Sequence, residues 1–369
     1  MTVIGFEIDF LPVGEESKSG DAILFRYKEE YDKQKIILID GGHKESKNVK
    51  TSDTILNHMR RCYYPNSRAE MHIDHIVCSH PDKDHIGGLQ GVMEQCSVGT
   101  FWINNPLDYV NYSEFEDGSG DEKFYKSHVD RVEQLIGIAD QKNISVKSPL
   151  QGESIGPLVV CSPSAEFYKD LVRGELTRQL GGKNKFMQTL VEAAKRTKII
   201  KWVRAEWGKD DLEDYPVTSV RNESSTVLFG NLMNGEYKFL LTADAGVEAL
   251  SRSYGYLKDI HGYISGSMKF VQMPHHGSRR NVNTKVLDHI LGNKILRGSS
   301  ERGYSFASVA KESEDYPRKA VINAFSTRGF VCSSTAGRNI WYRENLPGRY
   351  DDGPIPCIPY SDEVEALDE

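Results

Sequence analysis

The chain has 369 residues, 38% hydrophobic and 27% charged, a composition typical of a globular protein with one large domain or one domain carrying a sizeable insertion. Its formal net charge of -7 at pH 7 excludes indiscriminate binding of nucleic acid by the whole surface, although a local basic groove is compatible with it. No run approaches the roughly 20 apolar residues that span a bilayer, and the first residues lack a signal-peptide pattern, so we expect a cytoplasmic protein with no membrane partner.

The N-terminal part of the chain has the pattern of a layered α/β fold. Five segments have the apolar patterns of strands: residues 3–13, 22–28, 35–40, 75–78 and 99–103. Two segments have helical spacing: residues 51–62 and 87–94. In the first of these helices we expect His58 on the surface. This order of strands and helices predicts half of an αββα sandwich.

Four potential metal ligands follow the strand at 75–78 within six residues: His80, Asp82, Asp84 and His85. A loop at the end of a buried strand would bring them to one point, where imidazole and carboxylate groups suit one or two divalent ions such as zinc. Such clusters in Pro-containing loops are often solvated turns, but the preceding strand and the following glycines favour a metal site. Asp40, at the end of another strand, either orients a ligand by a hydrogen bond or simply begins a turn.

Residues 105–220 exceed what a minimal sandwich needs and form a largely helical insertion. We expect a polar, acidic loop, then helices and one strand: residues 108–121, 124–140, 158–161 and 165–173. A basic helix is expected at 185–204, with Lys195, Lys198 and Lys201 close to two tryptophans. Basic residues interleaved with aromatic ones suit a groove for single-stranded nucleic acid, but a solvated helix face with one tryptophan packed inward is the simpler interpretation.

The C-terminal part of the chain predicts a second sheet. Strand patterns occur at residues 224–230, 237–243, 269–273, 320–325, 330–333 and 339–342. Asp244 and the pair His275 and His276 follow two of these strands directly. The tail at 346–369 is acidic and rich in Pro and Gly, so we expect it to be loosely packed.

The run SHPDKDHIGGL at 79–89 resembles the metallo-β-lactamase fold superfamily, whose mark is HxHxDH after a strand. It is most similar to the hydrolase domain of ComEC-type competence proteins, in which the second His is commonly Asp. Further matches follow in the family's order: FLPVG at 10–14, GDAIL at 20–24, LIDGG at 38–42, NESSTVL at 222–228, FLLTADA at 239–245 and PHHGS at 274–278. In FLLTADA, Ala243 stands where the family usually has Gly. The resemblance implies an αββα hydrolase domain over 1–345, with the insertion at 105–220 and the tail after it.

Carried over position by position, the resemblance implies that His80 and Asp82 bind one ion and that Asp84 and His85 bind another. Asp244 would bridge the two ions, and Asp82 and Asp84 would also be the catalytic carboxylates. His276 is favoured over His275 as the last ligand, which leaves His275 to contact substrate. The resemblance supplies no counterpart for the His that usually completes the first site. Because Asp82 also replaces an imidazole, manganese stays open beside zinc.

These features favour a metal-dependent phosphodiesterase or nuclease acting on DNA or RNA. A divalent ion lowers the pKa of a coordinated water to about 7, and two ions can clamp the attacking and leaving oxygens of a phosphodiester. Arg279 and Arg280 would meet the phosphate, or else they are plain surface charges. Two alternatives are a hydrolase of another ester, a thioester or a lactam, and a metal-binding module whose insertion or tail contacts protein partners, for example in a defence complex.

Overall fold

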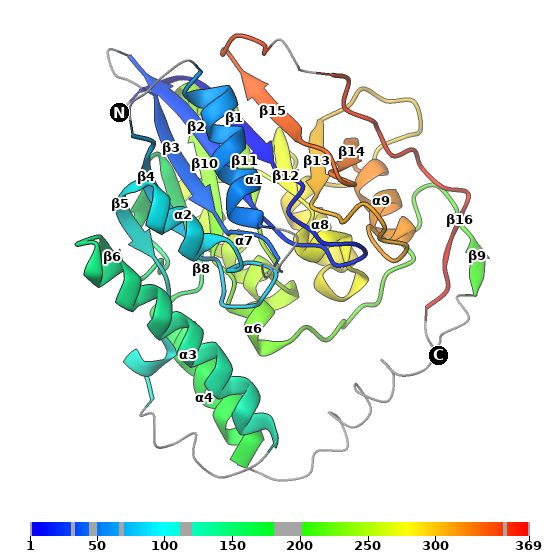
Figure 1. Cartoon of the computed structure of the whole chain (residues 1–369). Coiled ribbons are helices and arrows are strands. Elements are labelled where there is room, and N and C mark those ends of the chain that lie inside the picture. Colours follow the sequence, from blue (N-terminus) through cyan, green and yellow to red (C-terminus); the bar gives the residue numbers. More distant parts are fainter. Residues whose placement is uncertain are drawn as a thin grey trace.

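Two seven-stranded mixed sheets lie face to face at the centre of the molecule, with helices on both outer sides (Figure 1). The computed structural model describes residues 2–30, 34–43, 50–65, 70–110, 120–180, 201–349 and 353–367, and within them only the backbone of 120–127 and 175–180. In this part of the chain no helix is long and apolar enough to cross a membrane.

The first sheet has the order β15-β1-β2-β3-β4-β5-β6. Its strands are β1 Val3–Phe10, β2 Ile23–Glu29, β3 Lys35–Ile39, β4 His72–Val77, β5 Ser97–Trp102, β6 Ser145–Lys147 and β15 Ile340–Glu344. Strands β3 to β6 run parallel, and parallel neighbours need crossover connections. Helices supply these crossovers: α1 Thr51–His58, extended by a π-helical turn at Met59–Tyr63, then α2 Leu89–Gln95 and α3 Gly120–Gln141.

The second sheet has the order β14-β13-β12-β11-β10-β8-β7. Its strands are β7 Ser154–Ile155, β8 Leu158–Ser162, β10 Val227–Leu232, β11 Tyr237–Leu241, β12 Phe270–Gln272, β13 Gly303–Ala307 and β14 Phe330–Ser334. The other α-helices in the described residues are α4 Ala165–Leu180, α6 Val220–Glu223, α7 Val247–His261, α8 Thr284–Leu291 and α9 Lys319–Ser326. A separate two-stranded sheet pairs β9 Trp202–Arg204 with β16 Glu363–Glu365.

Three apolar layers hold the sandwich together, one between the sheets and one under the helices on each outer side. Between the sheets, fully buried Phe6 of β1 stacks on Phe239 of β11 with ring centroids 5.6 Å apart. Truncating such a ring to alanine typically costs about 3–5 kcal/mol. Helices α1, α2 and α3 cover the first sheet, and α7, α8 and α9 cover the second (Figure 1). The predicted αββα sandwich is therefore confirmed.

Three predictions of secondary structure in the second half of the chain were wrong in type or place. Residues 320–325 form helix α9, because a short, continuously apolar run is compatible with a buried helix as well as with a strand. The run at 339–342 forms β15, which pairs with β1 in the first sheet and not with the second. Residues 202–204, assigned to the basic helix, form strand β9, while 181–200 lie outside the described residues.

The tail is better packed than its composition predicts. Val364 of β16 is fully buried, and the backbone N–H of Ile358 donates to the carbonyl of Cys332 at 2.7 Å. Arg279 donates to the carbonyls of Glu365 and Ala366 at 2.8 and 3.0 Å. These contacts fix the end of the described chain against the second half of the sandwich.

His58 is buried, which corrects its expected place on the surface of α1. Its Nε2 lies 3.1 Å from Asp9 Oδ2, and Arg349 donates to Asp9 Oδ1 at 2.6 Å. Burial disfavours the imidazolium form, but the hydrogen bonds and charges of Asp9 and Cys62 outweigh burial and raise the pKa of His58 to about 9.

We expect this ion pair to make folding stability depend on pH. Since the pKa of His58 is 6.5 when unfolded and about 9 when folded, its contribution is fully present below pH 6.5 and is lost as pH rises through 9. Over this pH range the contribution of His58 to the free energy of unfolding changes by on the order of 3 kcal/mol. Denaturant unfolding of the wild type and of His58→Gln between pH 6 and pH 9.5 measures it. Equal pH slopes would contradict the assignment, and His72→Gln, at a half-exposed histidine, is the control.

Candidate metal centre

The candidate site lies where several strand ends meet at one edge of the sandwich. Asp40 follows β3 and the loop at 78–88 follows β4; the carboxyl ends of these parallel strands share that edge. Asp244 follows β11 and His276 follows β12, another parallel pair. Asp21 precedes β2, which runs antiparallel to β3, so it reaches the same edge. The topology thus gathers residues more than 200 positions apart.

Four side chains form a compact group of donor atoms: Asp84, His85, Asp244 and His276. One ligand atom from each lies within 4.8 Å of the others. His85 Nε2 is 3.3 Å from Asp244 Oδ1, and His276 Nε2 is 3.5 Å from Asp84 Oδ2. The Asp84 side chain is 30% exposed, whereas the other three are at most 4% exposed, so Asp84 marks the solvent side.

A second group lies on the other side of Asp244. His80 Nε2 is 3.9 Å from Asp82 Oδ2 and 3.9 Å from Asp244 Oδ2, and His275 Nε2 is 3.5 Å from the same Asp244 oxygen. The two oxygens of Asp244 therefore face different groups, Oδ1 toward His85 and Oδ2 toward His80 and His275. This is the arrangement that a bridging carboxylate needs.

Several buried atoms of both groups have no hydrogen-bond partner among the described residues: His80 Nε2, His85 Nε2, Asp244 Oδ1, and both ring nitrogens of His276. A buried polar atom left unpaired costs about 1–3 kcal/mol, and native structures leave few of them. Imidazole nitrogens and carboxylate oxygens converging without partners fit a divalent cation with nitrogen and oxygen ligands, such as zinc or manganese.

The ionisation of these groups reflects burial and mutual charge. Burial, aided by the charge of His85, lowers the pKa of His80 to about 4, which keeps the ring neutral. For His276, burial is outweighed by Asp84, Asp244 and Asp21, and the pKa rises to about 9. Burial is likewise outweighed at Asp84, where His276 and His85 lower the pKa to about 2. The carboxylate is thus held ionised, as a ligand must be.

Asp40 holds the ring of His85 through the ring nitrogen Nδ1. Its Oδ2 lies 2.7 Å from His85 Nδ1 and accepts from Ser79 Oγ at 2.6 Å, while Oδ1 accepts from the Ser79 backbone N–H at 2.8 Å. With Nδ1 at Asp40, Nε2 is the ring nitrogen of His85 that faces Asp244, and a cation would bind it in place of a proton. This is the contact expected of an orienting carboxylate.

The backbone adopts unusual φ angles at several residues that make these contacts. Four non-glycine residues at the site have positive φ: Asp40 at 62°, Ala243 at 44°, His275 at 48° and His276 at 60°. The left-handed φ at Ala243 is one that glycine adopts more readily than alanine. Gly41 and Gly88 approach so closely that a Cβ on Gly88 would lie 2.7 Å from the Gly41 carbonyl oxygen.

The other predicted site residues do not belong to the two donor groups or lie outside the described residues. Arg279 is committed to backbone carbonyls of residues 211, 365 and 366, which favours a structural role over phosphate binding. Arg280 is exposed beside it. Lys195 and Lys198 lie outside the described residues, and Lys201 is exposed next to β9.

No sequence pattern indicated two residues that contact Asp82. His128 Nε2, from α3 of the insertion, lies 2.7 Å from Asp82 Oδ1, and Arg221 Nη1 donates to the same oxygen at 2.9 Å. Both bind the oxygen that faces away from His80. Asp21 was also missed: its Oδ1 is 3.9 Å from His276 Nδ1, although its place in the GDAIL run could have indicated it.

Comparisons with known proteins agree with this picture. A family model described as the metallo-beta-lactamase superfamily matches residues 19–166. The search of curated proteins found no match.

Solved structures that match this chain share little sequence identity with it. A diphosphatase from the PhnP family is 10% identical, over 94% of this chain and all of that one, with a TM-score of 0.39. The dizinc quorum-quenching lactonase AidC is 13% identical, over 61% of this chain and 56% of that one, with a TM-score of 0.30. A long form RNase Z from yeast is 12% identical, over 72% of this chain and 32% of that one, with a TM-score of 0.28. The chain thus spans about half of the lactonase and a third of the RNase.

The family match includes the loop that bears His80 to His85. This loop lies at the edge of an αββα sandwich, among the buried imidazole nitrogens and carboxylate oxygen that have no hydrogen-bond partner in the described residues. The family match therefore covers residues 19–166, the part of the sandwich that carries this loop.

Proposed function

We propose that the chain is a metal-dependent phosphodiesterase that cleaves DNA or RNA, with zinc or manganese at the two donor groups around Asp244. In this proposal one domain over 1–345, similar to the ComEC-type hydrolase, carries the activity, and residues 105–220 are its insertion. The match to the superfamily model supports a metal-dependent hydrolase. The substrate class is our own inference.

The observation that carries the proposal is that the two carboxylate oxygens of Asp244 face different donor groups. Its Oδ1 is 3.3 Å from His85 Nε2 and its Oδ2 is 3.9 Å from His80 Nε2, so one carboxylate serves two adjacent positions. Phosphodiester hydrolysis benefits more than most hydrolyses from two neighbouring cations, because charge develops on both the attacking and the leaving oxygen.

The side chains then have distinct tasks. Bound divalent ions would supply Lewis acidity for water activation and for neutralising the phosphate. Asp84, ionised and the most exposed of its group, holds and orients water on the open side. His275 is fixed through Nδ1, 3.0 Å from Asn281 Oδ1, and presents Nε2 toward Asp244 and the substrate.

Metal removal tests the proposal directly. Protein stripped with a chelator is expected to lose hydrolysis of bis-p-nitrophenyl phosphate and of single-stranded DNA or RNA, and zinc or manganese is expected to restore both. Elemental analysis should find one or two ions per chain. A protein that holds no transition metal even after reconstitution would contradict the metal assignment.

The basic segment has its own test. If Lys195, Lys198 and Lys201 contact phosphates, replacing all three with glutamine should weaken cleavage of nucleic acid and flatten its dependence on salt, while bis-p-nitrophenyl phosphate hydrolysis stays unchanged. Equal loss on both substrates would instead indicate that the segment is structural.

A further inference from the structure

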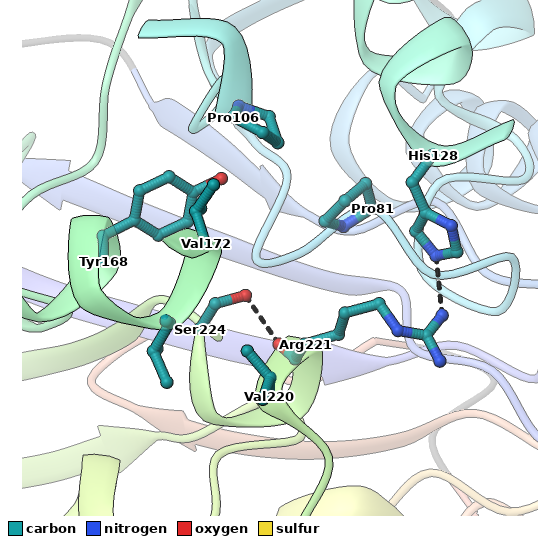
Figure 2. A pocket seen from close by; sticks show the side chains of 9 residues that line it. Pro81, Pro106, His128, Tyr168, Val172, Val220, Arg221 and Ser224 are labelled. Carbon is teal, nitrogen blue, oxygen red and sulfur yellow. Dashed lines mark hydrogen bonds between the residues drawn. The ribbon is translucent and has the colours of Figure 1, made fainter. Parts of the chain in front are cut away.

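A buried polar cluster lies between helix α1 and the first sheet. It shares no residue with the two donor groups of the metal centre, nor with the pocket that Pro81, His128 and Arg221 help to line beside them (Figure 2). In this cluster Asp9 of β1 is fully buried and His58 of α1 is 4% exposed. Charged groups buried this deeply are costly even when they are paired, and groups with strongly altered pKa values gather at functional sites.

Cys62 is the member of this cluster that reaches the surface. It is half-buried, in the π-helical turn that extends α1, and its Sγ lies 3.9 Å from His58 Nδ1. On the other side of the ring, His58 Nε2 lies 3.1 Å from Asp9 Oδ2. The amide of Asn339 is also 2.9 Å from Nδ1, and Arg349 is 3.2 Å from Nε2, so the ring is held from both sides. A thiol beside an imidazole that a carboxylate orients is the arrangement of an activated nucleophile.

The charges around the thiol favour its ionised form. Besides each other, Cys62 and His58 have five charged or titratable side chains around them: Glu7, Asp9, Arg61, Tyr63 and Arg349. Burial acts to raise the pKa of Cys62, but the hydrogen bond and charge of His58, together with the two arginines, outweigh burial and lower this pKa below its ordinary value of 9.0. The pKa of His58 is about 9, so its ring is an imidazolium at pH 7. The pair is thus shifted toward thiolate and imidazolium, and the thiolate is the nucleophilic form of cysteine.

Four of the other cysteines have the opposite character. They are buried, and burial raises the pKa of each thiol: Cys78, Cys96, Cys161 and Cys332. The sixth cysteine, Cys357, is exposed. The chain therefore contains its own reference for a thiol that solvent reaches freely.

We propose that Cys62 is a site of covalent modification by small disulfides. The Cys62 thiolate attacks one sulfur of the disulfide, the S–S bond of the disulfide breaks, and a mixed disulfide forms at Cys62. The other half leaves as a thiolate and takes the Nδ1 proton of the His58 imidazolium. Modification also removes one of the two groups, Asp9 and Cys62, that raise the pKa of His58. The stability that His58 contributes is then lost at a lower pH than in the unmodified protein.

The rate of thiol–disulfide exchange on the full chain tests this proposal. With 2-hydroxyethyl disulfide at pH 7, peptide mapping by mass spectrometry follows the mixed disulfide at Cys62 and at exposed Cys357. We expect His58→Gln to slow the reaction of Cys62 by at least about threefold and to leave Cys357 unchanged. The reason is that a rise of one unit in thiol pKa reduces the thiolate about tenfold and raises its nucleophilicity only about threefold. His72→Gln, at a half-exposed histidine, is the matched control that should change neither rate.

The wild type alone gives a second measurement, which does not require that His58→Gln folds. Its rate at Cys62 should level off at a lower pH than the rate of N-acetylcysteine, as a lowered thiol pKa requires. Identical pH profiles for the two thiols would overturn the proposal. So would the absence of a mixed disulfide at Cys62, or an unchanged rate at Cys62 in folded His58→Gln. None of these outcomes depends on the proposed phosphodiesterase function.

Discussion

Replacing Asp84 by alanine is expected to abolish turnover and leave a folded protein. Asp84 supplies one of four donor atoms that lie within 4.8 Å of one another, and its removal leaves His276 Nε2 without the carboxylate 3.5 Å away. Loss of a direct ligand should exceed the 10- to 100-fold effect that is typical of residues behind the ligands. Its side chain is partly exposed, so the deletion opens no cavity in the core.

Three measurements on Asp84→Ala separate chemistry from folding. Turnover of bis-p-nitrophenyl phosphate should fall by at least about 100-fold, metal content should fall, and the thermal unfolding midpoint of the metal-free protein should stay close to that of the wild type. Asp315→Ala, at a 64% exposed carboxylate, is the control. Activity above a tenth of the parent would count against the role of Asp84.

The sequence predicts the site loop better than it predicts the surroundings of that loop. His80 to His85 follow a strand, as expected, because local patterns record where a buried strand ends. Strand β15, by contrast, joins the first sheet by pairing with β1 more than 300 residues away, and no local pattern carries that information. The type of α9 was missed because its run of buried apolar residues has no polar face to reveal a period.

The difference between local patterns and tertiary contacts also explains which site residues could not be predicted from the sequence. Asp40 was expected to stand behind a ligand, and it lies against His85. His128 sits in a helix whose spacing indicates only a packing face, yet it reaches Asp82 because α3 crosses the metal loop. Arg221 arrives at the same oxygen from α6. Contacts between an insertion and the loop it covers depend on tertiary packing, which composition and periodicity do not encode.

Replacing Asp40 by asparagine is expected to weaken metal binding by about 10- to 100-fold without unfolding the protein. The carboxylate accepts from both the N–H and the hydroxyl of Ser79 and lies 2.7 Å from His85 Nδ1. An amide offers only one acceptor oxygen, so its NH2 group must face one of these donors. Rotating the NH2 group toward His85 would make Nδ1 an acceptor and put the proton on Nε2, which then could not donate a lone pair to a metal.

Competition with a coloured chelator measures the dissociation constant of zinc for the wild type and for Asp40→Asn. Asp74→Asn is the matched control, because Asp74 is also a mostly buried carboxylate at the first sheet, where it accepts from the Ile36 N–H at 2.8 Å without touching the donor atoms. If zinc affinity falls equally in both variants, the effect is a general loss of stability. If it is unchanged in Asp40→Asn, the lone pair of His85 does not depend on Asp40. A selective loss in Asp40→Asn, with both unfolding midpoints close to that of the wild type, is the result that the hydrogen bonds around His85 require.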